Sequence, residues 1–172
     1  KTIENLPTLI DRTVFPGLQG GPHMNTILAK AVAFDEALRP EFKDYAVTTI
    51  ANAKELAAQL TAKGLRLVTG GTDNHLLLID VKKSLNIDGA VAETALDAIG
   101  LNANKNVIPD DALPAFTPSG LRLGTPALTT RGLRPEHMAQ IAGWIFSAIQ
   151  NHDKPEVLSG LKNEVTAFAR QF

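Results

Sequence analysis

Residues 119–132 read Ser-Gly-Leu-Arg-Leu-Gly-Thr-Pro-Ala-Leu-Thr-Thr-Arg-Gly, and the rest of the chain is best understood from this stretch. Neighbouring side chains on a β-strand point to opposite faces, so burial of Leu121 and Leu123 turns Arg122 toward the other face. The Thr-Pro pair is expected to end the strand, because proline has no N–H to donate to a neighbouring strand. A glycine on each side of the triplet keeps bulk away from the guanidinium.

Arg122 therefore presents a planar, permanently charged fork from a rigid strand. The natural partner of such a fork is a carboxylate or a phosphate, bound through two parallel hydrogen bonds. A single arginine on a strand is more often part of a structural salt bridge. Residue type and spacing alone leave both interpretations open and favour the salt bridge.

The composition is that of one ordinary globular domain. The chain has 172 residues, of which 44% are hydrophobic and 20% charged, enough for a full core without covalent staples. The 17 basic and 18 acidic side chains give a net charge of −1, which argues against a dedicated binder of nucleic acid or anionic membrane. Cysteine is absent, which excludes a disulfide scaffold, a thiolate zinc site and a cysteine nucleophile.

The sequence shows neither a membrane-spanning pattern nor, at its start, a signal-peptide pattern. No apolar run approaches the length needed to span a bilayer. The chain begins Lys-Thr-Ile-Glu, without an initiator methionine or a signal-peptide pattern. We therefore expect it to be part of a longer protein.

The first third of the chain predicts two helices after an irregular start. Residues 1–22 are expected to be irregular, because prolines and glycines interrupt every pattern. Apolar residues recur at intervals of three and four from Met24 to Leu38, which predicts a helix ended by an Arg-Pro pair. A second helix is predicted over residues 42–60, with Gly64 as its C-terminal cap.

The remaining segments predict strands mixed with helices. Residues 65–69 and 76–81 read as strands around a turn, followed by a helix that Asp88 caps and Gly100 closes. Residues 101–108 are expected to be irregular. Pro135 suits the first position of a helix, whose apolar face is formed by Met138, Ile141, Ala142, Ile145 and Ile149.

The last helix is predicted to start with a capping box of Asp153 and Glu156. It is expected to bury Leu158, Leu161, Val165, Phe168 and Phe172. The fold class is therefore α+β: a small sheet covered by helices, with one long helix leading in from elsewhere.

Several smaller patterns carry little chemistry by themselves. Gly20 and Gly21 precede a helix and can present bare N–H groups to an anion, although a tight turn is the commoner explanation. Asp110 and Asp111 form a carboxylate pair in a loop and are expected to be solvated rather than catalytic. No pair of histidines has a metal-ligand spacing, and no dinucleotide-binding or nucleophile-elbow motif is present.

Four stretches stand out together: residues 15–22, residues 70–75, the Asn-Lys-Asn at 104–106 with Pro109, and residues 119–132. In this order and spacing they closely resemble the C-terminal portion of the serine hydroxymethyltransferase (glycine hydroxymethyltransferase) family. The resemblance runs from residue 1 to about residue 152, and residues 153–172 match no motif.

The resemblance implies a type I pyridoxal-phosphate fold. The family moves a one-carbon unit between serine and tetrahydrofolate, leaving glycine, and is expected to act as a cytoplasmic homodimer with pyridoxal 5'-phosphate as cofactor. By this resemblance, residues 1–22 are the tail end of the large cofactor domain and residues 23–39 are a connecting helix. Residues 40–172 are then the small C-terminal domain, with a short, mostly antiparallel sheet covered by helices. Neither a metal, a nucleic acid nor a membrane is implied.

The resemblance also implies roles for individual residues. Arg122 matches the arginine that binds the carboxylate of the amino-acid substrate. Gly20 and Gly21 match the glycine pair that reaches the cofactor phosphate of the neighbouring subunit. Asn106 matches the folate-binding asparagine, whose amide offers the pterin ring both a donor and an acceptor. Supporting roles alone are assigned to Ser119, Thr125, Thr129 and Thr130.

The chain departs from the family at the cofactor. The family lysine that holds pyridoxal phosphate as a Schiff base lies in a threonine-rich stretch followed by His-Lys. None of the ten lysines here has that context: they are Lys1, Lys30, Lys43, Lys54, Lys63, Lys82, Lys83, Lys105, Lys154 and Lys162. The family's aspartate to the pyridine nitrogen, its ring-stacking histidine and its proton-transfer glutamate are also missing. We therefore expect the 172-residue chain alone to be inactive.

Two alternatives stay open. The first is another type I pyridoxal-phosphate enzyme, such as an aldolase of β-hydroxy amino acids. Asn106 argues against it, because a folate-independent enzyme does not need that amide. The second is a non-catalytic association domain, against which Arg122, Gly20 and Gly21 argue, because a pure scaffold has no use for an unpaired fork.

Overall fold

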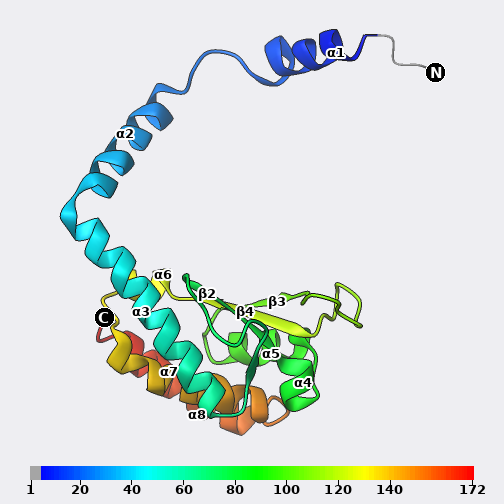
Figure 1. Cartoon of the computed structure of the whole chain (residues 1–172), viewed down its shortest axis with the longest axis vertical. Helices are drawn as coiled ribbons and strands as arrows, with labels where there is room; N and C mark the ends of the chain where they lie inside the picture. Colours follow the sequence, from blue (N-terminus) through cyan, green and yellow to red (C-terminus); the bar gives the residue numbers. More distant parts are fainter. Residues whose placement is uncertain (1–4) are drawn as a thin grey trace. The chain divides into compact units, whose positions relative to one another are not determined.

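The computed structural model describes residues 5–172 and divides the chain into two units, residues 1–43 and residues 44–172. Figure 1 shows the order of their helices and strands. Residues 1–4, which open the stretch assigned by resemblance to the large domain, lie outside the described residues.

The first unit contains more helix than the sequence predicts. Helix α1 spans Leu6–Arg12 and runs into a π-helical turn, Thr13–Leu18, interrupted at the extended Phe15. The prediction of an irregular start is therefore wrong for these residues. Pro7 lies in the first turn of α1, where a helix does not need the missing N–H. Helix α2 spans Met24–Leu38, as predicted, and its apolar side chains are exposed within this unit.

The second unit is α+β. Its first helix, α3 (Pro40–Ala62), begins in the last four residues of the first unit. The other helices and strands are β1 (Arg66–Leu67), β2 (Leu76–Asp80), α4 (Val81–Leu85), α5 (Gly89–Ala98), β3 (Asn104–Asn106), β4 (Gly120–Gly124), α6 (Pro126–Thr130), α7 (Met138–Gln150) and α8 (Pro155–Ala169). A 3₁₀ turn, Pro135–His137, leads into α7. The predicted second helix, strands and central helix are confirmed, with β1 shorter than expected. The short helices α4 and α6 were not predicted.

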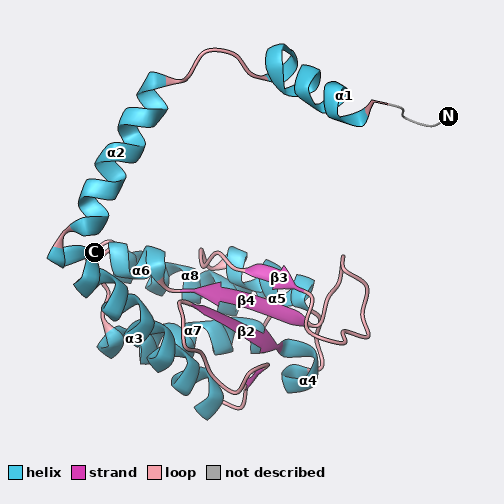
Figure 2. Cartoon of the chain, turned by 45° about the horizontal axis from the view of Figure 1, so that its top comes forward, coloured by secondary structure: helices cyan, strands magenta, loops and turns pink. Residues whose placement is uncertain are grey.

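The strands form one antiparallel sheet in the order β1-β2-β4-β3. This confirms the predicted small antiparallel sheet, and Figure 2 shows helices stacked against one of its faces. The irregular structure predicted for residues 101–108 is wrong at β3. Lys105 lies opposite the buried Leu121 on the helix-facing side of the sheet. Its ammonium group forms a salt bridge with Glu93 of α5 at 3.1 Å. Because a lysine occupies the helix-facing position of β3, the strand lacks the apolar alternation that would predict it.

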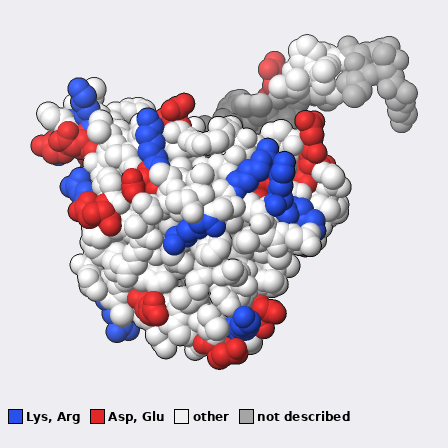
Figure 3. All heavy atoms as spheres, turned by 60° about the horizontal axis from the view of Figure 1, so that its bottom comes forward, with Lys and Arg blue, Asp and Glu red and all other residues white. Residues whose placement is uncertain are grey.

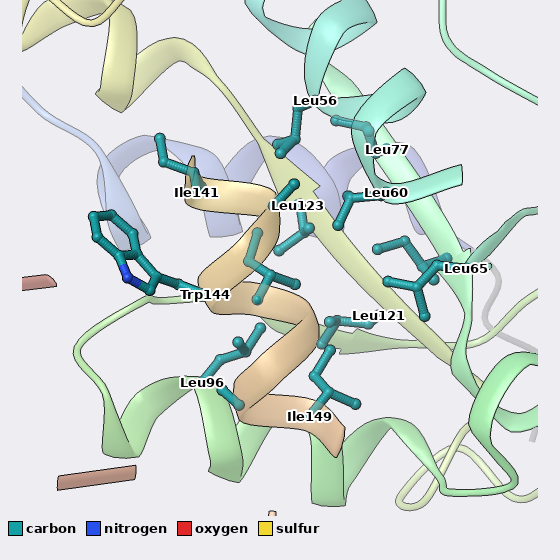
Figure 4. Packing of buried hydrophobic residues seen from close by; sticks show 14 of the residues in the cluster. Leu56, Leu60, Leu65, Leu77, Leu96, Leu121, Leu123, Ile141, Trp144 and Ile149 are labelled. Carbon is teal, nitrogen blue, oxygen red and sulfur yellow. The ribbon is translucent and has the colours of Figure 1, made fainter. Parts of the chain in front are cut away.

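The core lies between that face of the sheet and the helices. Leu121 and Leu123 of β4 point toward α7, beside Leu56 and Leu60 of α3 (Figure 4). The predicted face of α7 is confirmed, because Met138, Ile141, Ala142, Ile145 and Ile149 are all buried. Helix α8 packs outside α7, and Val165 is its one buried residue. The burial predicted for α8 is therefore too extensive, with Leu158, Leu161 and Phe168 half-buried and Phe172 exposed.

Of the two helix caps predicted with an aspartate, the structure confirms one and shows the other to be wrong. Asp88 accepts a hydrogen bond from the Val91 N–H at 2.9 Å and caps α5 as predicted. The capping box predicted for α8 is wrong: Lys154 is the N-cap residue and makes no side-chain cap. Asp80, at the end of β2, accepts a hydrogen bond from the Lys83 N–H at 2.9 Å and caps α4. The carboxylate of Asp80 therefore turns the chain out of the sheet one residue before the predicted strand end.

Candidate functional site

Arg122 lies on the open face of the sheet, which is the face opposite the core. It is paired with Leu78 of β2 on one side and Asn104 of β3 on the other. Directly opposite residues of antiparallel strands share a face, so these three side chains form one row. Leu121 and Leu123 are buried while Arg122 is exposed, which confirms the alternation expected from the sequence.

The guanidinium of Arg122 has no hydrogen-bond or ion-pair partner among residues 5–172. The sheet holds a second arginine, Arg66, whose Nη1 lies 2.7 Å from Oδ2 of the buried Asp80. A structural salt bridge is therefore formed by Arg66 and not by Arg122. The interpretation that spacing alone favoured for Arg122 is not supported within the described chain.

Arg122 lines a cleft of about 710 Å³ together with Asn106 and the turn that precedes β2. The turn folds on itself: the Thr72 hydroxyl donates to the Leu76 carbonyl at 2.6 Å, and Asn74 Oδ1 accepts from the Leu76 N–H at 2.7 Å. Gly70 has a φ of +72°, which favours glycine. The fold therefore brings three of the four sequence motifs to one cleft.

Asn106 is half-buried at the end of β3. Its Nδ2 donates to the Val107 carbonyl at 2.7 Å, and its Oδ1 has no hydrogen-bond partner within the described chain. The amide keeps an unused acceptor and a second N–H. It can therefore offer a ligand both a donor and an acceptor.

Gly120 is required for the approach of β3 to β4. A Cβ atom there would lie 2.5 Å from the Asn106 carbonyl oxygen and 2.6 Å from Cγ2 of Ile108. A Cβ at Gly124 would make only ordinary contacts, the nearest at 3.4 Å. Both glycines were expected to keep bulk away from the guanidinium. At Gly120 the structure shows a different role, because the missing side chain makes room for the strand that carries Asn106.

Buried polar side chains attach the end of β4 to α3. The Thr125 hydroxyl donates to the Thr49 carbonyl at 2.8 Å. Asn52, which is fully buried, donates through Nδ2 to Thr129 Oγ1 at 2.9 Å and to the Leu133 carbonyl at 3.0 Å. Asn52 was not predicted from the sequence. Its signal was an amide beside the apolar face of a predicted helix.

Asp111 was expected to be solvated, but its carboxylate accepts four hydrogen bonds. The donors are the N–H groups of Ile108, Leu113 and Ser119 and the hydroxyl of Ser119. Burial raises the pKa of the Asp111 carboxyl, but these hydrogen bonds, led by the Ser119 hydroxyl, outweigh it and lower the pKa from 3.8 to about 2. The expectation is therefore wrong for Asp111, whereas Asp110 is exposed.

The lowered pKa of Asp111 predicts an acid-sensitive stability. A carboxylate whose folded-state pKa lies below its unfolded value stabilises fully above the unfolded value, and this stabilisation is lost as the pH falls through the folded value. We expect Asp111→Asn to lower the free energy of unfolding most above about pH 5, and progressively less between about pH 4 and pH 2. Urea unfolding of the chain across this range measures it, with Asp110→Asn as the control for net charge. An equal loss at every pH would contradict the assignment.

Gly20 and Gly21 lie in the first unit, between the π-helical turn and α2. Their N–H groups make no hydrogen bond with residues 5–172, and a Cβ atom on either would meet no atom within 4 Å. The N-cap residue of α2, His23, provides no side-chain cap. The segment therefore has free backbone donors that can serve an external anion such as a phosphate.

Comparison with known protein families shows which family this chain belongs to. A family model described as serine hydroxymethyltransferase matches residues 1–145 of the chain. The chain belongs to the serine hydroxymethyltransferase family. It is also 50% identical over 163 residues to a curated serine hydroxymethyltransferase from Acidobacterium capsulatum. That similarity covers 95% of this chain and 38% of the relative, so the chain spans well under half the length of that serine hydroxymethyltransferase.

The family-model match to serine hydroxymethyltransferase includes all four motifs and ends within α7. In the part of the chain that the structure describes, no three metal-ligating side chains come together. No helix described there is long and apolar enough to cross a membrane. On the face shown in Figure 3, basic and acidic side chains are interspersed, as expected from their nearly equal numbers.

Proposed function

We propose that the full-length protein is a pyridoxal-phosphate-dependent serine hydroxymethyltransferase. It would interconvert serine plus tetrahydrofolate and glycine plus methylenetetrahydrofolate. The observation that carries the proposal is the unpaired guanidinium of Arg122 in a cleft shared with Asn106, in a chain that belongs to this family. The cleft would bind the amino acid and the folate.

Arg122 would bind the carboxylate of serine or glycine through two charge-assisted hydrogen bonds. Pairing on both sides of β4 fixes the strand that carries this side chain. A carboxylate held at two points leaves the amino group and the side chain of the substrate in one orientation. Such orientation can remove several kcal/mol from a reaction barrier.

Asn106 would hydrogen-bond the pterin ring of tetrahydrofolate. Its free Oδ1 accepts from a ring N–H, and its second N–H donates to a ring acceptor. Because Arg122 and Asn106 line the same cleft, this assignment brings the one-carbon acceptor to the amino-acid site. That geometry favours a folate-dependent transfer over a folate-independent aldol cleavage.

Gly20 and Gly21 would bind the phosphate of pyridoxal 5'-phosphate held by the neighbouring subunit of a homodimer. Their free N–H groups and open Cβ positions support this assignment. When bound, the cofactor supplies the electron sink that stabilises carbanions. The same proposal divides the chain into the end of the large domain (1–22), a connecting helix (23–39) and the small domain (40–172), and it places the protein in the cytoplasm.

The 172-residue chain alone would not turn over substrate, because none of its lysines has the sequence context of the cofactor-binding lysine. The test compares this chain with the full-length protein. We expect bound-cofactor absorbance and tetrahydrofolate-dependent cleavage of serine from the full-length protein, and neither from the chain. Cleavage of β-hydroxy amino acids with no need for folate would favour an aldolase. A full-length protein without either activity would refute the proposal.

A further inference from the structure

The connection between β3 and β4 is closed by one carboxylate. Asp111 accepts from the Ile108 N–H at 3.2 Å, just beyond the end of β3. It also accepts from the Ser119 N–H at 2.9 Å and the Ser119 hydroxyl at 2.6 Å, immediately before β4. A fourth bond, from the Leu113 N–H at 3.0 Å, holds the loop itself. Asp111 therefore ties together the end of β3, where Asn106 lines the cleft, and the start of β4.

Strand β3 needs such support because it is short. It has three residues and lies at the edge of the sheet, so few ladder hydrogen bonds hold it. Glu93 of α5 holds its middle, accepting from the Lys105 N–H at 3.1 Å and pairing with the Lys105 ammonium at 3.1 Å. Asn106 lies between this anchor and the one made by Asp111.

We propose that Asp111 is a positioning residue for the candidate site: by joining Ile108 to Ser119, it fixes the amide of Asn106 relative to the guanidinium of Arg122. The inference rests on the proposed function, in which the amide binds folate and the guanidinium binds the amino acid. Arg122 has a support that does not involve β3, because β2 pairs with β4 along its whole length, from Gly120 to Gly124. Loss of Asp111 therefore affects the folate side more than the amino-acid side.

Asp111→Asn in the full-length holoenzyme tests this division. An asparagine replaces one acceptor oxygen with an NH₂ group, which cannot accept from N–H or O–H donors. We expect the KM for tetrahydrofolate to rise about tenfold, the effect of losing hydrogen bonds to a charged group. The KM for serine is expected to stay within about twofold, because Arg122 keeps its place. A general loss of folded protein would not separate the two constants.

The chain offers a matched control beside the tested residue. Asp110 lies in the same loop, is exposed, and makes no hydrogen bond with residues 5–172. Its φ of 55° is one that asparagine tolerates. Asp110→Asn makes the same change in charge and is expected to leave both constants unchanged. Ser119→Ala removes only the 2.6 Å bond and is expected to raise the folate KM by a smaller factor in the same direction.

Amide hydrogen exchange on the 172-residue chain gives a second measurement that needs no turnover. We expect Asp111→Asn to speed exchange at Ile108 and Ser119, and Asp110→Asn to leave it unchanged. Unchanged exchange at both amides, or equal changes in the two KM values, would overturn the role of Asp111. Wild-type turnover is measured first, and an inactive full-length protein would count against the proposed function. The exchange data then test separately whether Asp111 holds the two strand ends together.

Discussion

Under the proposed function, replacing Arg122 by alanine in the full-length protein is expected to raise the KM for serine by roughly 100- to 10,000-fold. A hydrogen bond to a charged group contributes about 1.5–3 kcal/mol, and a carboxylate held by a guanidinium makes two of them. Each 1.4 kcal/mol corresponds to about a tenfold change. Arg122→Lys keeps the charge but loses the planar fork, so its KM for serine is expected to lie between the wild-type value and that of Arg122→Ala.

The serine effect should arise without loss of folding or of cofactor. Arg122 has no hydrogen bond or ion pair among residues 5–172, so its removal breaks no polar interaction within the described chain. Steady-state kinetics, thermal unfolding and bound-cofactor absorbance together test this expectation. Arg170→Ala is the matched control, because Arg170 is an exposed arginine at the C-terminal end of α8. A near-normal serine KM in Arg122→Ala would show that another group binds the carboxylate.

Features of the fold that depend on local sequence were predictable. The alternation of Leu121, Arg122 and Leu123 fixes which side chains face the core, and the structure confirms it. The helix spacing in α2 and α7 predicts their positions closely, and the Asp88 cap marks the start of α5. In each case the determining interaction lies within a few residues along the chain.

Features that depend on distant partners were missed. Strand β3 lacks an apolar pattern because Lys105 is satisfied by Glu93, twelve residues earlier on α5. The loop residue Asp111 cannot be told from Asp110 by local sequence, because its four donors come together only in the folded loop. Asn52 bonds to Thr129, which is 77 positions away. Residue type indicates what a side chain can bind, whereas the fold decides whether its partner lies inside the protein.

Arg122 is an example within the candidate site: residue type indicated its possible ligands, and the fold decided whether it had a partner inside the protein. The sequence alone left a structural salt bridge and a ligand-binding fork open, and the family resemblance favoured the fork. In the structure the sheet's own carboxylate, Asp80, is engaged by Arg66 at 2.7 Å. Arg122 is left free on the open face. The pairing of one arginine therefore determines the availability of the other, which no local pattern could reveal.

Gly89→Ala is expected to destabilise the chain by about 3 kcal/mol, because α5 begins in contact with the backbone at the start of β4. A Cβ atom at Gly89 would lie 2.2 Å from the Gly120 carbonyl oxygen and 3.0 Å from that of Pro118. The Gly89 N–H donates to the same Pro118 carbonyl at 2.6 Å. Neither backbone oxygen can rotate away as a flexible side chain could, so the helix must shift away from the sheet.

The expected loss corresponds to a fall of roughly 6–12 °C in the melting temperature of the chain. Gly160→Ala is the matched control: it lies inside α8, where an added Cβ meets no atom within 4 Å. Alanine there is expected to raise stability by about 0.5–1 kcal/mol, because glycine is the weaker helix former. A Gly89→Ala chain that melts with the wild type would show that α5 does not approach β4 this closely. The strand that carries Arg122 would then lack the backbone support that the fold assigns to it.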